Sequence, residues 1–231
     1  MANTTKNQAA PEVQETVNQN EAFILKYKNA IIGCAVAAVV IILGAIFWHS
    51  HATSNQAKAN TMMSQAEDIF GQALQYGDSL MFSRALNGDS TGVAGFLSVI
   101  DEYGSTAAGN VAKLYAGLCY AHMGQWQQAA DYLNKFSDTG DQMIAPAAIG
   151  ALGDAYAHLD QLDKAVDQYK KAASKASNAT LSPMYLVKAG EILESQGKKA
   201  EALKLYQQVK DQYVQSAAYQ TIDEYIQRVT E

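Results

Sequence analysis

Histidine is the residue type in this chain that is best suited to metal binding or acid–base catalysis, because a neutral imidazole binds zinc and exchanges protons near neutral pH. Four histidines occur among the 231 residues. His49 and His51 are two residues apart, and His122 and His158 lie far downstream, 36 residues from each other. A zinc site takes three or four protein ligands, and no such set is evident around either pair. We therefore predict no metal site and no cofactor.

The two cysteines do not indicate a disulfide framework or a catalytic thiol. Cys34 lies in an apolar run, and Cys119 lies in a helical pattern without a nearby base that would activate it. Both are interpreted as small buried hydrophobic residues. The sequence also contains no glycine-rich phosphate loop, no G-x-S-x-G and no H-E-x-x-H motif. We expect that the protein is not an enzyme.

The composition of the chain disfavours nucleic acid as a partner. The formal net charge is −6 and the pI is about 5.2, whereas nucleic-acid binding relies on basic patches that neutralise phosphates. Hydrophobic residues make up 48% of the sequence, which is enough for a substantial core. A folded domain with protein partners is the expectation.

Three segments of the chain can be superimposed at spacings of 36 and 37 residues, as expected for a repeat protein. They are LYAGLCYAHMGQWQQAADYLNKF (114–136), IGALGDAYAHLDQLDKAVDQYKKA (149–172) and YLVKAGEILESQGKKAEALKLYQQV (185–209). The alignment matches Gly117, Gly153 and Gly190, then Tyr120, Tyr156 and Leu193, then Ala129, Ala165 and Ala202, then Leu133, Tyr169 and Tyr206. A helical glycine costs about 1 kcal/mol relative to alanine, so three in register predict close helix packing.

These matched positions resemble the tetratricopeptide repeat signature. In that family, a small residue and an aromatic residue on helix A meet a small residue on helix B, so that the two helices cross closely. The resemblance implies an all-α fold, with three such repeats over residues 105–213. The tryptophan usual near the start of helix A is replaced by Lys113, Ile149 and Leu186.

Turn and cap signals recur with the same period. Gly124, Asp160 and Gly197 align four residues before the expected second helices, where a helix-ending turn is needed. Pro146 and Pro183 are predicted to open first helices, and Ser182 is predicted to be an N-cap.

The segments on either side of the repeats are also predicted to be helical. Residues 92–104 have the pattern of the second helix of a degenerate leading repeat, whose partner is the long stretch from about 52 to 86. We therefore assign residues 50–104 to a long helix plus this leading repeat. Residues 214–231 are predicted to form an amphipathic helix that caps the array.

The expected helix A positions define a candidate groove for a partner. Its residues are small, apolar or acidic, and they would suit an extended peptide or a helix with some positive charge. The candidate groove residues are His122, Asp154, His158, Met184, Val187, Glu191 and Glu194.

An uncharged run from Ala30 to Trp48 predicts one transmembrane helix, since 19 residues span roughly 28 Å. Lys26 and Lys28 precede this run and the far side has no Lys or Arg until Lys58, so the positive-inside rule predicts a cytoplasmic N-terminus. Residues 1–29 would be a short disordered cytoplasmic tail.

Two alternative interpretations of the apolar run are disfavoured. A cleaved signal peptide, processed near residues 57–59, does not fit because the run is long and the preceding region is extended. A lipoprotein modified at Cys34 does not fit because the apolar stretch follows this cysteine, whereas a lipobox follows its apolar stretch.

The whole layout resembles the YfgM-type ancillary subunits of the bacterial Sec translocon, over residues 20–231. The resemblance implies a bacterial inner-membrane protein with a periplasmic repeat domain, an adaptor whose partners are translocon subunits, exported proteins or chaperones. The alternative is an envelope-assembly or cell-division factor of the Tol-Pal-associated type. A small-molecule receptor or an enzyme would instead require an enclosed polar pocket.

Overall fold

The computed structural model describes the backbone of residues 10–231 and the side chains of residues 26–30, 32–34 and 36–231. It divides into two compact units, residues 1–54 and residues 55–231. The first helix, α1 (Ala10–Tyr76), contributes to both. Residues 10–29 of the expected disordered tail are therefore helical, and residues 1–9 lie outside the described part. Helix propagation into 10–29 costs little once a long apolar helix has formed.

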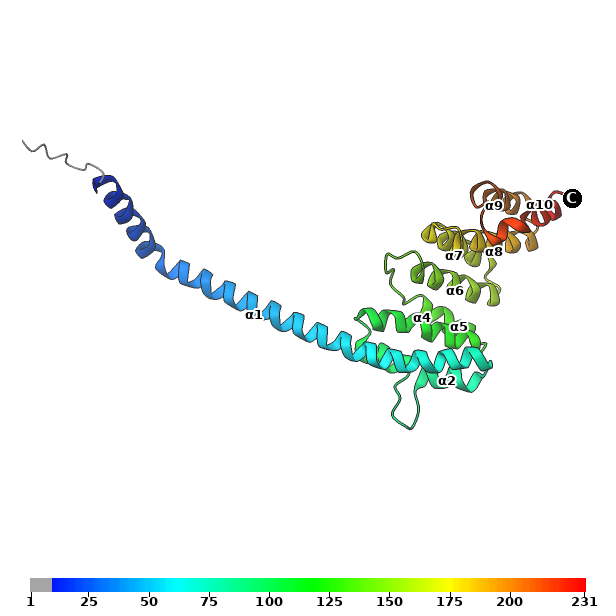
Figure 1. The fold of residues 1–231 in the computed structure, drawn as a ribbon, viewed down its shortest axis with the longest axis horizontal. Coiled ribbons are helices and arrows are strands. Elements are labelled where there is room, and N and C mark those ends of the chain that lie inside the picture. Colours follow the sequence, from blue (N-terminus) through cyan, green and yellow to red (C-terminus); the bar gives the residue numbers. More distant parts are fainter. Residues whose placement is uncertain (1–9) are drawn as a thin grey trace, which may run out of the picture. The chain divides into compact units, whose positions relative to one another are not determined.

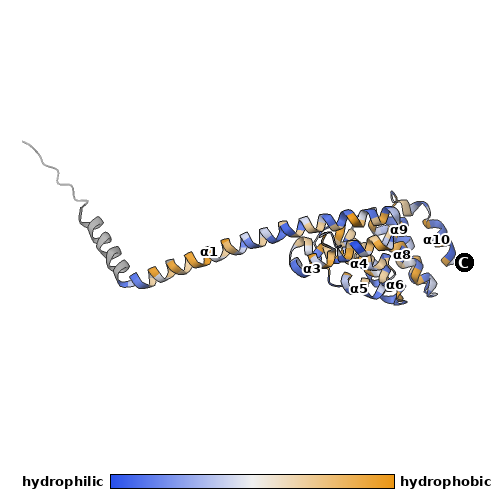
Figure 2. Ribbon diagram, turned by 90° about the horizontal axis from the view of Figure 1, so that it is seen from below, coloured by the Kyte–Doolittle hydropathy of each residue, from blue (hydrophilic) through white to orange (hydrophobic). Residues whose placement is uncertain are grey.

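In the first unit, α1 carries one segment long and apolar enough to span a membrane. Its most apolar 18-residue window has a mean hydropathy of 2.9 and is not buried by any other part of the protein. The large side chains there are mostly more than half exposed, up to 78% for Trp48. Figure 2 shows the run as an orange stretch of α1. The predicted range 30–48 lies inside this candidate transmembrane helix.

The second unit contains the three predicted helix pairs. They are α4 (Ala107–His122) with α5 (Trp126–Leu133), α6 (Ile144–His158) with α7 (Leu162–Ala176), and α8 (Leu181–Ser195) with α9 (Lys199–Gln212). Figure 1 shows them stacked in chain order. Among the described residues there is no β-strand beyond an isolated bridge between Gly88 and Ala94. The prediction of an all-α repeat array is confirmed.

The leading repeat differs in detail from the expected single stretch over 52–86. Helix α1 ends at Tyr76, and α2 (Ser79–Asn87) follows. The break occurs because Gly77 has a φ of +66°, which favours glycine, and Asp78 then accepts the Leu80 N–H to cap α2. The predicted second helix corresponds to α3 (Phe96–Tyr103).

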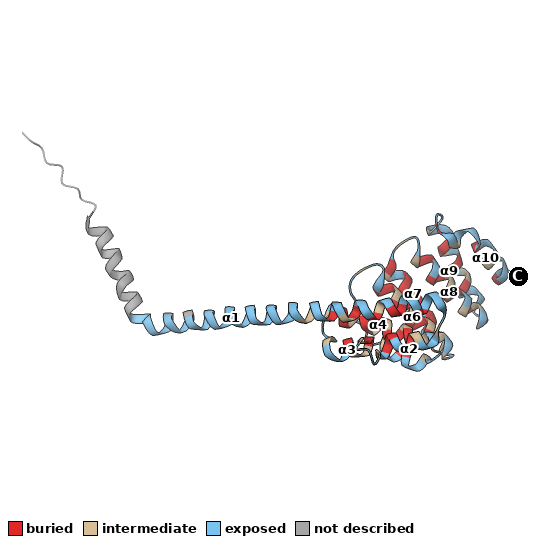
Figure 3. Cartoon of the chain, turned by 60° about the horizontal axis from the view of Figure 1, so that its bottom comes forward, coloured by how far each residue is buried: buried red, intermediate tan, exposed pale blue. Residues whose placement is uncertain are grey.

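The predicted C-terminal helix is also divided, into η1 (Ala217–Gln220) and α10 (Ile222–Thr230). Ile222 and Val229 of α10 are buried in one cluster with Tyr206 and Val209 of α9. Helix α10 therefore covers the last hydrophobic face of the array, as repeat proteins require. Figure 3 shows the buried residues gathered between successive helices of this unit.

The glycines in register sit where large side chains of helix B cross helix A. A Cβ on Gly117 would lie 2.6 Å from the Leu133 side chain, and one on Gly153 would lie 2.8 Å from the Tyr169 ring. Gly190 is covered in the same way by Tyr206. The aligned alanines of helix B, Ala129, Ala165 and Ala202, have no exposed surface. The helix pairs therefore cross closely, as the repeat signature predicted.

The repeated turn residues Gly124, Asp160 and Gly197 all have positive φ angles, of 73°, 57° and 74°. This left-handed conformation ends helices, so the predicted turns are confirmed. The N-cap prediction for Ser182 was wrong: the helix already begins at Leu181, and the buried Ser182 hydroxyl donates to the Ala173 carbonyl.

The capping role next to Ser182 belongs to Asn178, whose Oδ1 accepts the N–H groups of Thr180 and Leu181. One repeat earlier, the carboxylate of Asp141 accepts the Met143 N–H at 2.7 Å in the same way. Pro146 and Pro183 both occupy the third position of their helices, where a missing N–H has no intrahelical partner to lose.

Candidate functional site

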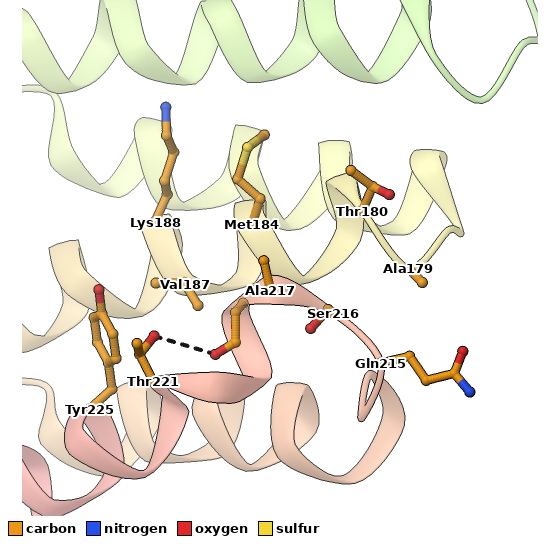
Figure 4. A pocket seen from close by; sticks show the side chains of 11 residues that line it. Ala179, Thr180, Met184, Val187, Lys188, Gln215, Ser216, Ala217, Thr221 and Tyr225 are labelled. Carbon is orange, nitrogen blue, oxygen red and sulfur yellow. Dashed lines mark hydrogen bonds between the residues drawn. The ribbon is translucent and has the colours of Figure 1, made fainter.

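Two of the candidate groove residues, Met184 and Val187, line a pocket of about 590 Å³ at the C-terminal end of the array. We call it the terminal pocket. Helix α8 forms one wall, and η1 with α10 forms the other, through Ala217, Thr221 and Tyr225. Figure 4 shows Val187 and Tyr225 next to each other, from opposite walls. The lining is mainly apolar, and Met184 remains 39% exposed.

Asp154, on α6, is held by the protein's own side chains. Its Oδ1 accepts the Tyr169 hydroxyl at 2.6 Å and the Lys188 ammonium at 2.6 Å. Lys188 also lies over the Tyr169 ring, 5.4 Å from its centroid. Burial and the hydrogen bond to Asp154 both raise the pKa of Tyr169. Asp154 therefore joins three consecutive helices, α6, α7 and α8, and its charge is matched by Lys188.

Glu194, on α8, makes a similar cluster with a tyrosine and a base, although the residue that aligns with Asp154 in the repeat is Glu191. Its carboxylate accepts two hydrogen bonds from Arg228, at 3.0 and 2.9 Å, and one from the Tyr206 hydroxyl at 3.1 Å. The hydrogen bonds from Arg228 hold the pKa of Glu194 below its usual range. A bidentate arginine pair is among the stronger charged contacts in proteins, so Glu194 also fixes helix positions.

Glu191 differs from these two acids. It lies one helical turn beyond Val187, it is exposed, and no ion pair holds it among the described residues. Burial raises the pKa of Tyr225, and the charge and hydrogen bond of Glu191 raise it further. Glu191 does not itself line the terminal pocket, but it lies one helical turn from Val187 and acts on Tyr225, both of which line it, so we place its carboxylate at the pocket's edge.

The two histidines of the candidate groove do not line the terminal pocket. The His122 ring stacks on Phe82 of α2 with centroids 4.3 Å apart, and burial lowers its pKa. The His158 ring stacks on Trp126 of α5 at 3.6 Å. Both histidines thus pack on neighbouring aromatic rings. Over the residues that the structure describes, no group of three or more potential metal ligands comes together.

Sequence reasoning missed the second wall of the pocket and the two basic residues that neutralise acids. Residues 214–231 were predicted only to cap the array, and that prediction does not place Ala217, Thr221 and Tyr225 at a pocket. A signal for the pairs did exist: Asp154 and Lys188 are 34 residues apart, and so are Glu194 and Arg228. An acid and a base at this common separation could have indicated contacts between helices two apart along the chain, α6 with α8 and α8 with α10.

Comparisons with known proteins agree with this architecture. Two crystal structures of a putative kinesin light chain with nearly identical TPR-like repeats from Podosopora anserina, one of them carrying a single substitution, are similar to the chain. Each has a TM-score of 0.57 and 14% sequence identity, over 74% of this chain and 85% or 86% of the other. A search of curated proteins returns no match. The family model for the tetratricopeptide repeat-like domain matches residues 21–228, and the chain therefore belongs to the tetratricopeptide repeat-like family.

Proposed function

We propose that this protein is a membrane-anchored scaffold for other proteins, with its repeat domain in the bacterial periplasm, where it acts as an adaptor at the translocon or for exported and envelope proteins. The observation that carries the proposal is one chain that combines a candidate transmembrane helix with a repeat array. An anchor keeps the array at a membrane, and helical repeat arrays commonly bind proteins along extended surfaces.

The flanks of the apolar run support the orientation. Lys26 and Lys28 lie just before it, and Trp48 lies at its far end, where an amphipathic ring suits the membrane interface. In this orientation the acidic repeat domain is on the exported side. Its negative charge also disfavours a position flat on anionic lipids.

The contacts around α8 support a binding role based on shape and apolar surface. Asp154 and Glu194 are each neutralised by an internal base, so they do not form a general acidic groove. The remaining features are the mainly apolar terminal pocket and Glu191 at its edge, which has no ion-pair partner in the described part of the chain. We also propose that the protein has no catalytic role, because none of these groups forms a nucleophile and base pair.

The proposal can be tested by affinity purification of the full chain from membranes of the organism that naturally produces it. The adaptor function predicts that translocon subunits and newly exported proteins co-purify with it. Enrichment of cell-wall or division proteins alone would favour the envelope-assembly alternative instead.

The orientation has its own test. Alkaline phosphatase is active only in the periplasm, so we expect activity when it is fused after Glu231. Green fluorescent protein fused at the same site should not fluoresce when it is exported by the same route. The opposite pattern would place the repeat domain in the cytoplasm and contradict the proposal.

A further inference from the structure

The terminal pocket is an unfilled cavity, whereas an aromatic side chain fills the corresponding position one repeat earlier. Val187 aligns with Gly150 one repeat earlier, at a separation of 37 residues. At that earlier junction the Tyr185 ring packs directly over Gly150, so that no Cβ could be added there. At the later junction the residue that aligns with Tyr185 is Ile222, which is buried in the α9–α10 core instead. Val187 is therefore left facing a cavity.

The shape and lining of this cavity suit a large apolar side chain. Its volume of about 590 Å³ lies within the range of small-molecule sites and therefore leaves room for one large side chain. Met184, Val187 and Ala217 offer carbon surface from two walls. The flexible methionine side chain adapts to different apolar shapes, and its 39% exposure leaves apolar area that a partner would bury.

The charges at the rim favour a cation beside that side chain. Lys188 is already bound to Asp154, and Arg228 is already bound to Glu194. These two pairs sum to zero, which leaves the charge of Glu191, next to Tyr225, without a counterion among the described residues. A lysine or arginine of a partner would complement it, whereas a carboxylate would be repelled.

The geometry of α8 sets the spacing between the two partner groups. Val187 and Glu191 are four residues apart on one helix, a rise of about 6 Å. Two residues of an extended chain rise about 6.6 Å. A peptide in extended conformation would therefore place an apolar side chain in the pocket and a basic side chain two positions away beside Glu191.

We propose that the terminal pocket binds an extended partner segment in which a large apolar residue and a lysine or arginine are separated by one residue. This inference rests on the proposed scaffold function and names the partner chemistry for one of its surfaces. The apolar residue occupies the space between α8, η1 and α10, and the basic residue pairs with Glu191.

The test uses the full chain in lipid nanodiscs and fluorescein-labelled peptides with a Gly-Ser background. The probe peptides contain Leu-Ser-Lys and Lys-Ser-Leu, and the controls contain Leu-Ser-Glu, Ala-Ser-Lys and Leu-Ser-Ser-Ser-Lys. Fluorescence anisotropy measures the binding. At least one probe should bind about tenfold more tightly than all three controls, a difference that one charge pair or one buried side chain can supply.

Three variants locate the binding. Glu191→Lys should reverse the preference, so that Leu-Ser-Glu binds better than Leu-Ser-Lys. Ala217→Trp places a ring from η1 into the pocket and should abolish the advantage of leucine over alanine. Glu201→Lys makes the same charge change at an exposed position of α9 and should leave all affinities within about twofold. Circular dichroism checks that each variant is folded.

Equal binding of probes and controls, or a peptide preference that survives both Glu191→Lys and Ala217→Trp, would overturn the inference. The scaffold function is separable from it. If partners of the native chain still co-purify with both variants, they bind another surface, and only the terminal pocket proposal fails.

Discussion

At the scale of single residues, close contacts between a glycine and an aromatic ring join the second and third helix pairs, and Leu133 takes the place of the ring in the first. Gly153 and Gly190 lie under the rings of Tyr169 and Tyr206, and both tyrosines donate a hydroxyl hydrogen bond to an acid of the adjacent helix A. Each ring thus packs on a backbone at one end and satisfies its polar group at the other. This arrangement leaves no space for a side chain at the glycine position.

The glycine contacts can be tested with two matched substitutions. Gly190→Ala places a methyl group against the buried Tyr206 ring and should destabilise the repeat domain by about 1–3 kcal/mol. Gly71→Ala, on an exposed part of α1 where a Cβ meets nothing within 4 Å, should instead stabilise it by up to about 1 kcal/mol. Thermal unfolding followed by circular dichroism measures both, and a stabilising Gly190→Ala would contradict the packing described here.

Burial also determines the reactivity of Cys119. Its side chain has no exposed surface, and burial raises the pKa of its thiol to about 12. In a Cys34→Ser background at pH 8, the folded protein should react with Ellman's reagent on the order of a thousandfold more slowly than the chain unfolded in guanidinium, because each pKa unit changes the thiolate fraction tenfold. Rapid labelling of the folded protein would show that α4 is not packed as described.

The raised pKa of Cys119 also makes the stability of the fold depend on pH. A thiol with a higher pKa in the folded state than in the unfolded chain contributes stability below pH 9 that is lost as the pH rises from 9 towards 12. The melting temperature should therefore fall across this range. It should fall less in a Cys119→Ala variant, measured against its own value at pH 7.

At the scale of elements, the helix pairs were predictable from sequence because each one repeats the same few constraints. Glycine, alanine and a large side chain recur at fixed positions, and the turn residues recur between them. The helix starts were harder to predict. Asn178 and Asp141 cap backbone groups two to four residues ahead, while the more obvious Ser182 is used inside α8. Serine suits both roles, so local sequence alone does not separate them.

The cap of α8 gives a prediction at this scale. Asn178→Ala removes the acceptor for two N–H groups and also the donor to the Gln142 carbonyl. Loss of an N-cap typically costs about 1 kcal/mol, so the unfolding midpoint in urea should decrease. Gln207→Ala, at an exposed position inside α9, provides the control and should leave the midpoint nearly unchanged. An unchanged midpoint for Asn178→Ala would show that the cap is dispensable.

At the scale of the whole molecule, the sequence predicted the repeat array and an apolar helix before it, since both depend on periodicity and composition. The terminal pocket was not predictable in the same way. It depends on η1 and α10 taking the place of one amphipathic helix, and on Lys188 and Arg228 reaching acids 34 residues away. The acidic residues looked like a charged groove in the sequence, and the structure leaves only Glu191 among them without an ionic partner in the described region.

Photocrosslinking in living cells of the native organism can show whether this face of the array binds other proteins. A photoreactive amino acid is introduced at Met184 or Ala217 in the terminal pocket, and at the exposed Gln207 of α9 as a control. We expect light-dependent protein adducts from the two pocket positions, identified by mass spectrometry as translocon subunits or exported chains, and few from Gln207. Pocket positions that give no more protein adducts than Gln207 would contradict it.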